Sequence, residues 1–329
     1  MATIKDVSKL AGVSVATVSR YLNKNGYVSK EAELAIAEVI EKLNYRPNTI
    51  ARSLAGKKTA TVGLMVPDIL NPFFPELARA IEDAANTYGY TVMLCNTDND
   101  PAKEQRYIET LLHKQVDGII ISSYTIQPGH LSGLQKAGIP VVLLDNVFSS
   151  DSVVSLTVEN KRGGELAAEH LLELGCRKIA HICGPLSITS SRDRTAGFEA
   201  VSAGTDWFTP SLIGYSDFTV SGGYRTMKKL LADHPDLDGV FASNDLMAAG
   251  ALKALSEAGR CVPEDVKVIG FDGIGLEMLS PELSTIAQPI YELGKTAMDV
   301  LVALIGKETG IETDQVFPVT LTAKQSTVG

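Results

Sequence analysis

From residue 60 onward, short apolar runs alternate with longer segments in which apolar residues recur at helical spacing. The runs are nearly continuous in valine, isoleucine and leucine, which is typical of strands buried on both faces of a parallel sheet. Helical patterns such as 77–88 and 166–174 separate them. The predicted strands are 61–66, 91–95, 118–122, 140–144, 153–158, 178–183, 239–242 and 266–270. This alternation predicts an α/β fold of doubly wound parallel sheets, divided into two lobes.

Residues 1–44 show a different pattern, with three short helical segments. Thr3 and Asp6 fit a capping box, and Ser14 and Ser29 can cap the next two helices. Gly12 ends the first helix, and the second runs over about 15–22. Val18 and Tyr21 or Leu22 are expected to face inward from the second helix. The apolar positions at helical spacing in the first and third helices are Ile4, Val7, Leu10, Ala11, Leu34, Ile36, Val39, Ile40 and Leu43. Two helices joined by a glycine-containing turn and followed by a third are typical of a helix-turn-helix head.

Residues 45–60 connect the head to the rest of the chain. Pro47 prevents the third helix from continuing, Asn48 can cap a new helix, and Gly56 can end it. A helix of only two turns is marginal in water. We therefore expect this segment to act as a conditional hinge that becomes helical when something packs against it.

Charge is distributed unevenly along the chain. Residues 1–60 hold ten lysines and arginines against five acidic residues, a net charge of +5, which leaves −14 for the rest of a chain whose total is −9. A basic head on an acidic body indicates a nucleic-acid-binding module joined to a different domain.

The composition is that of a globular protein. Of 329 residues, 45% are hydrophobic and 21% charged. No apolar stretch reaches the roughly 18–20 residues that a membrane span needs, and the N-terminus has no apolar segment typical of a secretory signal. The four cysteines (Cys95, Cys176, Cys183 and Cys261) are far apart, as in proteins of a reducing compartment. We expect a cytoplasmic, nucleoid-associated protein.

Enzyme motifs are not found. The segments 52–58 and 294–296 resemble phosphate-binding loops but lack the leading glycine that such a loop needs. The motifs HExxH and GxSxG are absent, and the five histidines are scattered. The sequence therefore predicts no catalytic residues, no metal site and no cofactor, and an enzyme would be suggested only by the βαβ pattern itself.

The head resembles that of the LacI/GalR family of bacterial repressors. The resemblance rests on 4–7 (IKDV), 11–23 (AGVSVATVSRYLN), 45–48 (YRPN) and 51–54 (ARSL) at the family's mutual spacing. It implies that Val15, Ala16 and Arg20 read base edges in the major groove, and that Leu54 wedges into a central minor-groove step. The full set of implied DNA-binding residues is Thr3, Lys5, Ser14, Val15, Ala16, Thr17, Ser19, Arg20, Asn23, Asn48, Ala51, Arg52, Leu54 and Ala55.

The remainder of the chain resembles the periplasmic-binding-protein-like body of the same family. The resemblance implies a head (1–46), a hinge helix and linker (47–59) and an effector-binding and dimerisation domain (60–329). Within that domain, lobe 1 is expected at about 60–160 and 290–318, and lobe 2 at about 161–289 and 319–329. A homodimer would place one head on each half of a pseudo-palindromic operator.

Polar and aromatic residues gather just beyond the predicted strand ends. In doubly wound folds, ligands bind at the carboxyl ends of the strands. Aromatic faces suit the C–H faces of a sugar, and carboxylates, amides and guanidinium groups pair with its hydroxyls. The candidate effector-binding residues at these strand ends are Asn71, Phe73, Phe74, Asp145, Asn146, Arg194, Phe218, Asn244, Asp272 and Gln288, and the family resemblance adds Ser122.

This set is similar to the site of ribose-binding proteins and ribose operon repressors. It departs from them at Asn146, where arginine is common, and at Ser122, where asparagine is expected. We therefore expect a repressor of a sugar-utilisation operon that is released by ribose or a related small sugar. The alternatives are co-repression by a purine or by a phosphorylated carrier protein, and a sugar-binding transport protein.

Overall fold

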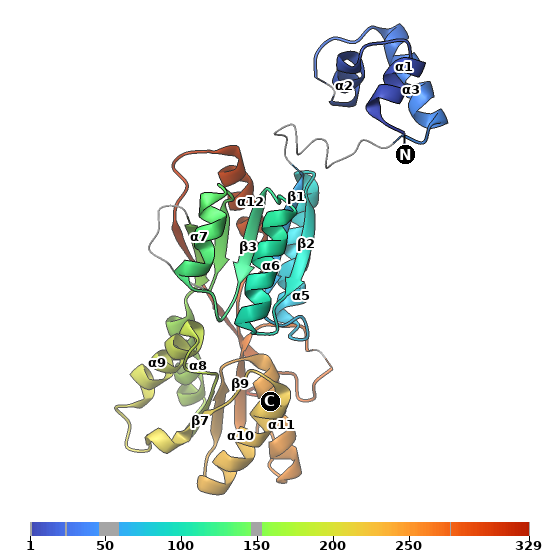
Figure 1. Cartoon of the computed structure of the whole chain (residues 1–329). Coiled ribbons are helices and arrows are strands. Elements are labelled where there is room, and N and C mark those ends of the chain that lie inside the picture. Colours follow the sequence, from blue (N-terminus) through green and yellow to red (C-terminus); the bar gives the residue numbers. More distant parts are fainter. Residues whose placement is uncertain (1, 24, 46–58, 146–152, 277, 329) are drawn as a thin grey trace. The chain divides into compact units, whose positions relative to one another are not determined.

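The computed structural model describes residues 2–23, 25–45, 59–145, 153–276 and 278–328. The chain divides into two compact units, residues 1–59 and 60–329 (Figure 1). We describe each unit by itself.

The first unit contains, over its described residues, the helices α1 (Ile4–Leu10), α2 (Val15–Asn23) and α3 (Lys30–Lys42). The predicted caps are confirmed: the Thr3 hydroxyl accepts a hydrogen bond from the Asp6 amide, and Ser14 and Ser29 accept from Thr17 and Ala32. Gly12 has a φ of +66°, a conformation that glycine adopts without strain.

The core of the head is small, with Val7, Val18 and Ile36 fully buried. Leu10 and Leu34, two of the apolar positions at helical spacing, are 58% and 73% exposed. A three-helix unit of this size presents too little surface to cover every apolar position on its helices.

The second unit contains two parallel α/β lobes, and each has a six-stranded sheet among its described residues (Figure 1). In lobe 1 the strand order is β11-β5-β4-β3-β1-β2, and all neighbours are parallel. Its helices are α5 (Phe73–Thr87) and α12 (Ile290–Gly306), which pack against each other, with α6 (Pro101–His113) and α7 (Pro128–Lys136) on the other side. The strands are β1 (Thr61–Val66), β2 (Thr91–Asn96), β3 (Gly118–Ser122), β4 (Val141–Leu144), β5 (Val153–Val158) and β11 (Asp314–Phe317).

Lobe 2 has the strand order β12-β10-β9-β8-β6-β7, with only β12 antiparallel to its neighbour among the described strands. Its helices pack as two pairs, α8 (Asn160–Glu173) with α9 (Thr189–Ser202) and α10 (Val220–Asp233) with α11 (Asp245–Glu257). A short 3-10 helix spans Pro210–Leu212. The strands are β6 (Ile179–Cys183), β7 (Ile213–Tyr215), β8 (Gly239–Ala242), β9 (Lys267–Asp272), β10 (Ser284–Ala287) and β12 (Thr320–Thr322).

Three crossover segments join the lobes within the described chain. They connect β5 to α8, β10 to α12, and β11 to β12. Residues 159, 288–289 and 318–319 therefore form the waist of the unit.

Among the described strands, the sequence prediction missed β7, β10, β11 and β12. Each of these strands has three or four residues. The strands β7, β11 and β12 are edge strands of their sheets, and each has exposed residues. Such strands lack the continuous apolar run that marks the buried ones. In the part of the chain that the structure describes, no helix is long and apolar enough to cross a membrane.

Glycine permits a close approach between α8 and α9. A methyl group added at Gly164 would overlap the backbone carbonyl oxygen of Arg194, which cannot move without shifting α9. We expect Gly164→Ala to lower the free energy of unfolding by about 1–3 kcal/mol, as overpacking does. Urea denaturation measures this change. Gly204→Ala is the control, because a methyl group there meets no atom within 4 Å, and an equal loss in both variants would contradict the prediction.

Candidate functional site

The second helix of the head presents the residues proposed to read bases. Val15 is 41% exposed, and Ala16 and Arg20 are also exposed, whereas Val18 on the opposite face is fully buried. The Arg20 side chain lies beside Gly26. One face of α2 therefore anchors the helix, and the other displays one guanidinium group between small apolar side chains, which suits a helix inserted into a major groove.

Of the remaining proposed DNA-binding residues, some have side chains that the structure describes, and others lie outside the described residues. Ser14 and Thr17 are hydrogen-bonded to each other, with 2.8 Å between their hydroxyl oxygens. Thr3 and Lys5 are exposed, and Ser19 is half-buried. The backbone of Asn23 belongs to α2. Asn48, Ala51, Arg52, Leu54 and Ala55 lie outside the described residues.

A cavity of about 310 Å³ lies between the two lobes. Its lining residues come from the carboxyl ends of strands in both sheets, where ligands bind in doubly wound folds. We call it the inner cavity. Its lining residues are Asn71, Phe73, Phe74, Tyr124 and Asp145 of lobe 1, and Ser190, Arg194, Phe218, Asn244, Asp272 and Gln288 of lobe 2.

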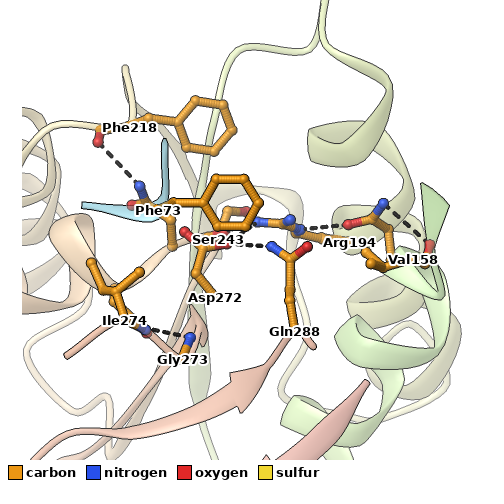
Figure 2. A network of polar contacts seen from close by, with 12 residues as sticks. Phe73, Val158, Arg194, Phe218, Ser243, Asp272, Gly273, Ile274 and Gln288 are labelled. Atoms are coloured by element: carbon orange, nitrogen blue, oxygen red, sulfur yellow. Dashed lines mark hydrogen bonds and ion pairs between the residues drawn. The ribbon is translucent and has the colours of Figure 1, made fainter. Parts of the chain in front are cut away.

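A buried polar network forms the lobe 2 side of the inner cavity (Figure 2). Arg194 Nε donates to Asn160 Oδ1 at 2.8 Å, and Nη1 donates to the Ser243 carbonyl at 2.6 Å and to Asp272 Oδ1 at 3.3 Å. Gln288 Nε2 donates to the same Asp272 oxygen at 2.7 Å. The guanidinium carbon lies 3.6 Å from the centre of the Phe271 ring. These contacts hold Arg194 and Asp272 rigidly in place.

Asp245 supports the turn that carries Asp272. Its Oδ2 accepts hydrogen bonds from the amides of Gly273 and Ile274 at 2.8 and 3.0 Å, and its Oδ1 accepts from the Thr285 hydroxyl at 2.7 Å. Figure 2 shows Gly273 below Asp272 and Ile274 to its left. The position of Asp272 is therefore set by α11 as well as by its own strand.

Burial perturbs the carboxyl groups of the inner cavity. It raises the pKa of Asp272 to about 6, although the neighbouring Arg194 charge acts in the opposite direction. Burial likewise raises the pKa of Asp145, again opposed by Arg194. A ligand that supplies hydrogen-bond donors would stabilise the ionised form of these carboxylates, because its hydrogen bonds would replace the lost contacts with water.

Two buried oxygens of the inner cavity have no hydrogen-bond partner in the described structure, Asp145 Oδ1 and Gln288 Oε1. Both are acceptors, and leaving a buried acceptor unpaired costs about 1–3 kcal/mol. A ligand rich in hydroxyl donors would satisfy them. The side-chain oxygens of Asn71 and Asn244 already accept from the first-turn amides of α5 and α11, so these helix starts are capped from within the protein.

Three residues of the inner cavity have a strained backbone. Asp145, Phe218 and Asp272 have φ values of +60°, +64° and +112°, a region that residues other than glycine rarely adopt. Asn244 Nδ2 donates a hydrogen bond to the Phe218 carbonyl oxygen at 3.1 Å. Strain of this kind persists only where the surroundings fix it, and it clusters at ligand sites.

The structure brings together most of the residues proposed from the sequence. Ser122 is fully buried in β3 and does not line the inner cavity, and Asn146 lies outside the described residues. Two lining residues were missed, Tyr124 and Ser190. Ser190 lies one helical turn before Arg194, a spacing that could have identified it. Tyr124 is two residues past the end of β3, in a loop without periodicity.

The family models match both units of the chain. Residues 3–48 match bacterial regulatory proteins of the lacI family, and residues 59–325 match the periplasmic binding proteins and sugar binding domain of the LacI family. The chain is 45% identical to a ribose operon repressor of Halalkalibacterium halodurans over 100% of this chain and 98% of that protein.

Two solved structures extend this similarity. A lac repressor dimer bound to operator and an anti-inducer matches with a TM-score of 0.88 at 28% identity, covering 100% of this chain and 99% of that chain. A transcriptional regulator from Enterococcus faecium with bound ribose matches with a TM-score of 0.72 at 34% identity, covering 81% and 98%.

Proposed function

The chain belongs to the LacI family of bacterial regulatory proteins, and from this premise we propose that it represses a sugar-utilisation operon and is released by ribose or a closely related pentose. It is a DNA-binding regulator and not an enzyme. We further propose that it acts as a homodimer on a pseudo-palindromic operator in the bacterial cytoplasm, as part of the nucleoid. In this proposal the head binds DNA, the hinge connects it to the body, and the body binds the effector and forms the dimer.

The observation that carries the proposed ligand is the donor and acceptor balance of the inner cavity. Two carboxylates, Asp145 and Asp272, line the inner cavity, and two of its buried oxygens, Asp145 Oδ1 and Gln288 Oε1, are unpaired acceptors. Arg194 is the only lysine or arginine among the described lining residues, and Asp272 balances its charge. A neutral, hydroxyl-rich sugar fits this chemistry, whereas a phosphate dianion would add acceptors and negative charge.

The proposed DNA contacts divide into reading and positioning. Arg20 can donate two hydrogen bonds to a guanine edge, and Val15 and Ala16 can contact thymine methyl groups. Ser14, Thr17, Ser19 and Asn23 are suited to phosphate oxygens, which fix the register without reading the sequence. Leu54 is the proposed minor-groove wedge, and Asn48, Ala51, Arg52 and Ala55 are its proposed neighbours at the groove.

Release of the operator requires a difference in affinity. A sugar can shift the protein away from its DNA-bound state only if it binds the other state more tightly. The inner cavity takes side chains from both lobes, so its affinity for a sugar depends on how the lobes are arranged. This dependence is the proposed link between ligand and operator.

The test is a ligand panel applied to the purified full chain. We expect D-ribose or D-xylulose to raise the melting temperature, because a ligand that binds only the folded state stabilises it, and to release DNA selected by the protein from a random duplex pool. D-ribose 5-phosphate and hypoxanthine should do neither. Stabilisation by hypoxanthine with tighter DNA binding would contradict the proposal in favour of a purine co-repressor, and the absence of any selected DNA would remove the repressor assignment.

A further inference from the structure

A second cavity lies directly outside the inner one. Its empty volume is about 740 Å³, and we call it the outer chamber. Asn71, Phe74, Tyr124 and Phe218 line both spaces. These four residues therefore form the partition between a smaller and a larger space.

The partition is mainly aromatic, and Tyr124 is its centre. The Tyr124 ring lies 6.5 Å from the Phe74 ring and 5.9 Å from the Phe218 ring, measured between ring centres. Phe74 belongs to lobe 1, as Tyr124 does, whereas Phe218 belongs to lobe 2. We call Phe74, Tyr124 and Phe218 the aromatic roof. Tyr124 is the member through which the roof crosses from one lobe to the other.

The loop that carries Tyr124 is tied to a buried carboxylate. Glu104 on α6 is fully buried, and its Oε2 accepts hydrogen bonds from the hydroxyls of Ser123 and Thr125, the latter at 3.0 Å. These two residues flank Tyr124. The Ser123 hydroxyl in turn accepts from the amides of Thr125 and Ile126, both at 3.1 Å. The loop is therefore fixed on both sides of Tyr124.

The other oxygen of Glu104 extends the same network. Oε1 lies 3.1 Å from His130 Nδ1 in the first turn of α7. The start of α6 does not depend on Glu104, because the Asp100 side chain caps it by accepting from the Ala102 amide at 2.9 Å. A carboxylate is buried only where hydrogen bonds compensate its lost hydration. Here those bonds come from the Tyr124 loop and from α7. Glu104 therefore holds the Tyr124 loop in position.

We propose that Tyr124 determines the size of the effector, closing the inner cavity over a single monosaccharide, and that Glu104 is the positioning residue that holds Tyr124 in the roof. This inference rests on the proposed function, since it concerns the same sugar site. The ring face covers the sugar and excludes a substituent that would extend into the outer chamber. Burial and the neighbouring Asp145 and Asp272 charges raise the pKa of the Tyr124 hydroxyl, which therefore remains a donor at neutral pH.

The first arm of the test replaces the tyrosine and measures binding by calorimetry, with D-ribose and with adenosine, in which a base extends the same sugar. The wild-type protein should bind adenosine at least about 100-fold more weakly than ribose. Tyr124→Ala should weaken ribose binding about 10-fold and reduce that selectivity to less than about 10-fold, because an aromatic wall of the site is lost. Tyr124→Phe keeps the ring and should keep the selectivity. Wild-type selectivity in Tyr124→Ala would overturn the proposal.

The second arm replaces the glutamate. Glu104→Ala should reduce the ribose-to-adenosine selectivity as Tyr124→Ala does, and Glu104→Gln should restore it, because an amide can accept from both hydroxyls and donate to His130. Operator affinity without sugar should stay within about 3-fold of wild type in both variants. If Glu104→Ala weakened both ligands equally and left the selectivity unchanged, Glu104 would be only a structural residue and the proposal would fail.

A readout without any ligand separates this inference from the proposed function. Hydrogen exchange of the Thr125 and Ile126 amides should accelerate at least about 10-fold in Glu104→Ala and stay at the wild-type rate in Glu104→Gln. If neither D-ribose nor D-xylulose binds the wild-type protein, the proposed effector is wrong. The exchange rates alone then decide whether Glu104 holds the loop, and unchanged rates would overturn that part.

Discussion

Replacing Asp272 by asparagine is expected to weaken D-ribose binding at least about 10-fold, because a hydrogen bond to a charged group contributes about 1.5–3 kcal/mol. Asparagine keeps the oxygen that accepts from Arg194 and Gln288, so the buried network survives and the loss falls on the ligand. Calorimetric titration measures the affinity. Operator binding without sugar should be unchanged, and the operator should no longer be released by ribose.

Asp193→Asn is the matched control, since it removes a carboxylate from the same lobe on a residue that does not line the inner cavity. Equal losses in the two variants would show that net charge, and not the contact at position 272, determines the affinity. A simultaneous loss of operator binding in Asp272→Asn would indicate misfolding.

The affinity for D-ribose should also fall as the pH is lowered through about 6. Burial raises the pKa of Asp272 to about 6, so the carboxylate takes up a proton near that pH. The ionised form accepts two or more hydroxyl hydrogen bonds and the protonated form fewer, so protonation competes with the sugar. Titrations between pH 5 and pH 8 test this. The dependence should flatten in Asp272→Asn, and an identical pH profile in that variant would assign it to another group.

The second large effect is expected in the head. Arg20→Ala should lower operator affinity about 10-fold or more for each half-site, since a bidentate arginine–guanine pair contributes about 1–3 kcal/mol. Mobility-shift titration at fixed salt, on DNA selected by the wild-type protein, measures it. The variant should fold normally, because Arg20 is exposed and the core residues Val7, Val18 and Ile36 are untouched.

Lys30→Ala provides the charge-matched control, as Lys30 is an exposed base at the start of α3. It should lower the affinity much less, and by a similar factor on all sequences, as a general electrostatic contribution does. If Arg20→Ala weakened binding to selected and random DNA equally, Arg20 would contact phosphates and the assignment of base reading would be wrong.

What could be predicted from the sequence was what local chemistry determines. The caps Thr3, Ser14 and Ser29 and the glycine after α1 depend on a few neighbouring residues, and their pattern identifies the head. The buried strands are marked by continuous apolar runs. Because parallel strands point their carboxyl ends at one edge of a sheet, the sequence also predicts that Asn71, Asp145 and Asp272 lie around one site, and all three line the inner cavity.

What could not be predicted depends on distant parts of the chain. Tyr124 enters the inner cavity because Glu104, on a preceding helix, fixes its loop, and no spacing in the sequence shows that contact. Strand β11 completes one sheet and β12 the other, although only two residues separate them. The exposure of Leu34 likewise follows from how much surface the neighbouring helices can cover.

The waist of the body has a mechanical consequence. Asn160, just beyond the first crossover, bonds Arg194, and Gln288, within the second, bonds Asp272. A ligand seated against Arg194 and Asp272 thus braces two of the three backbone connections about which the lobes could twist. The third connection, at Pro318 and Val319, does not itself line the inner cavity. Substitutions that make this connection stiffer or looser would change how much sugar binding lowers operator affinity, and would leave the affinity for the sugar nearly unchanged. The connection is therefore a natural point for adjusting the sensitivity of an engineered sensor.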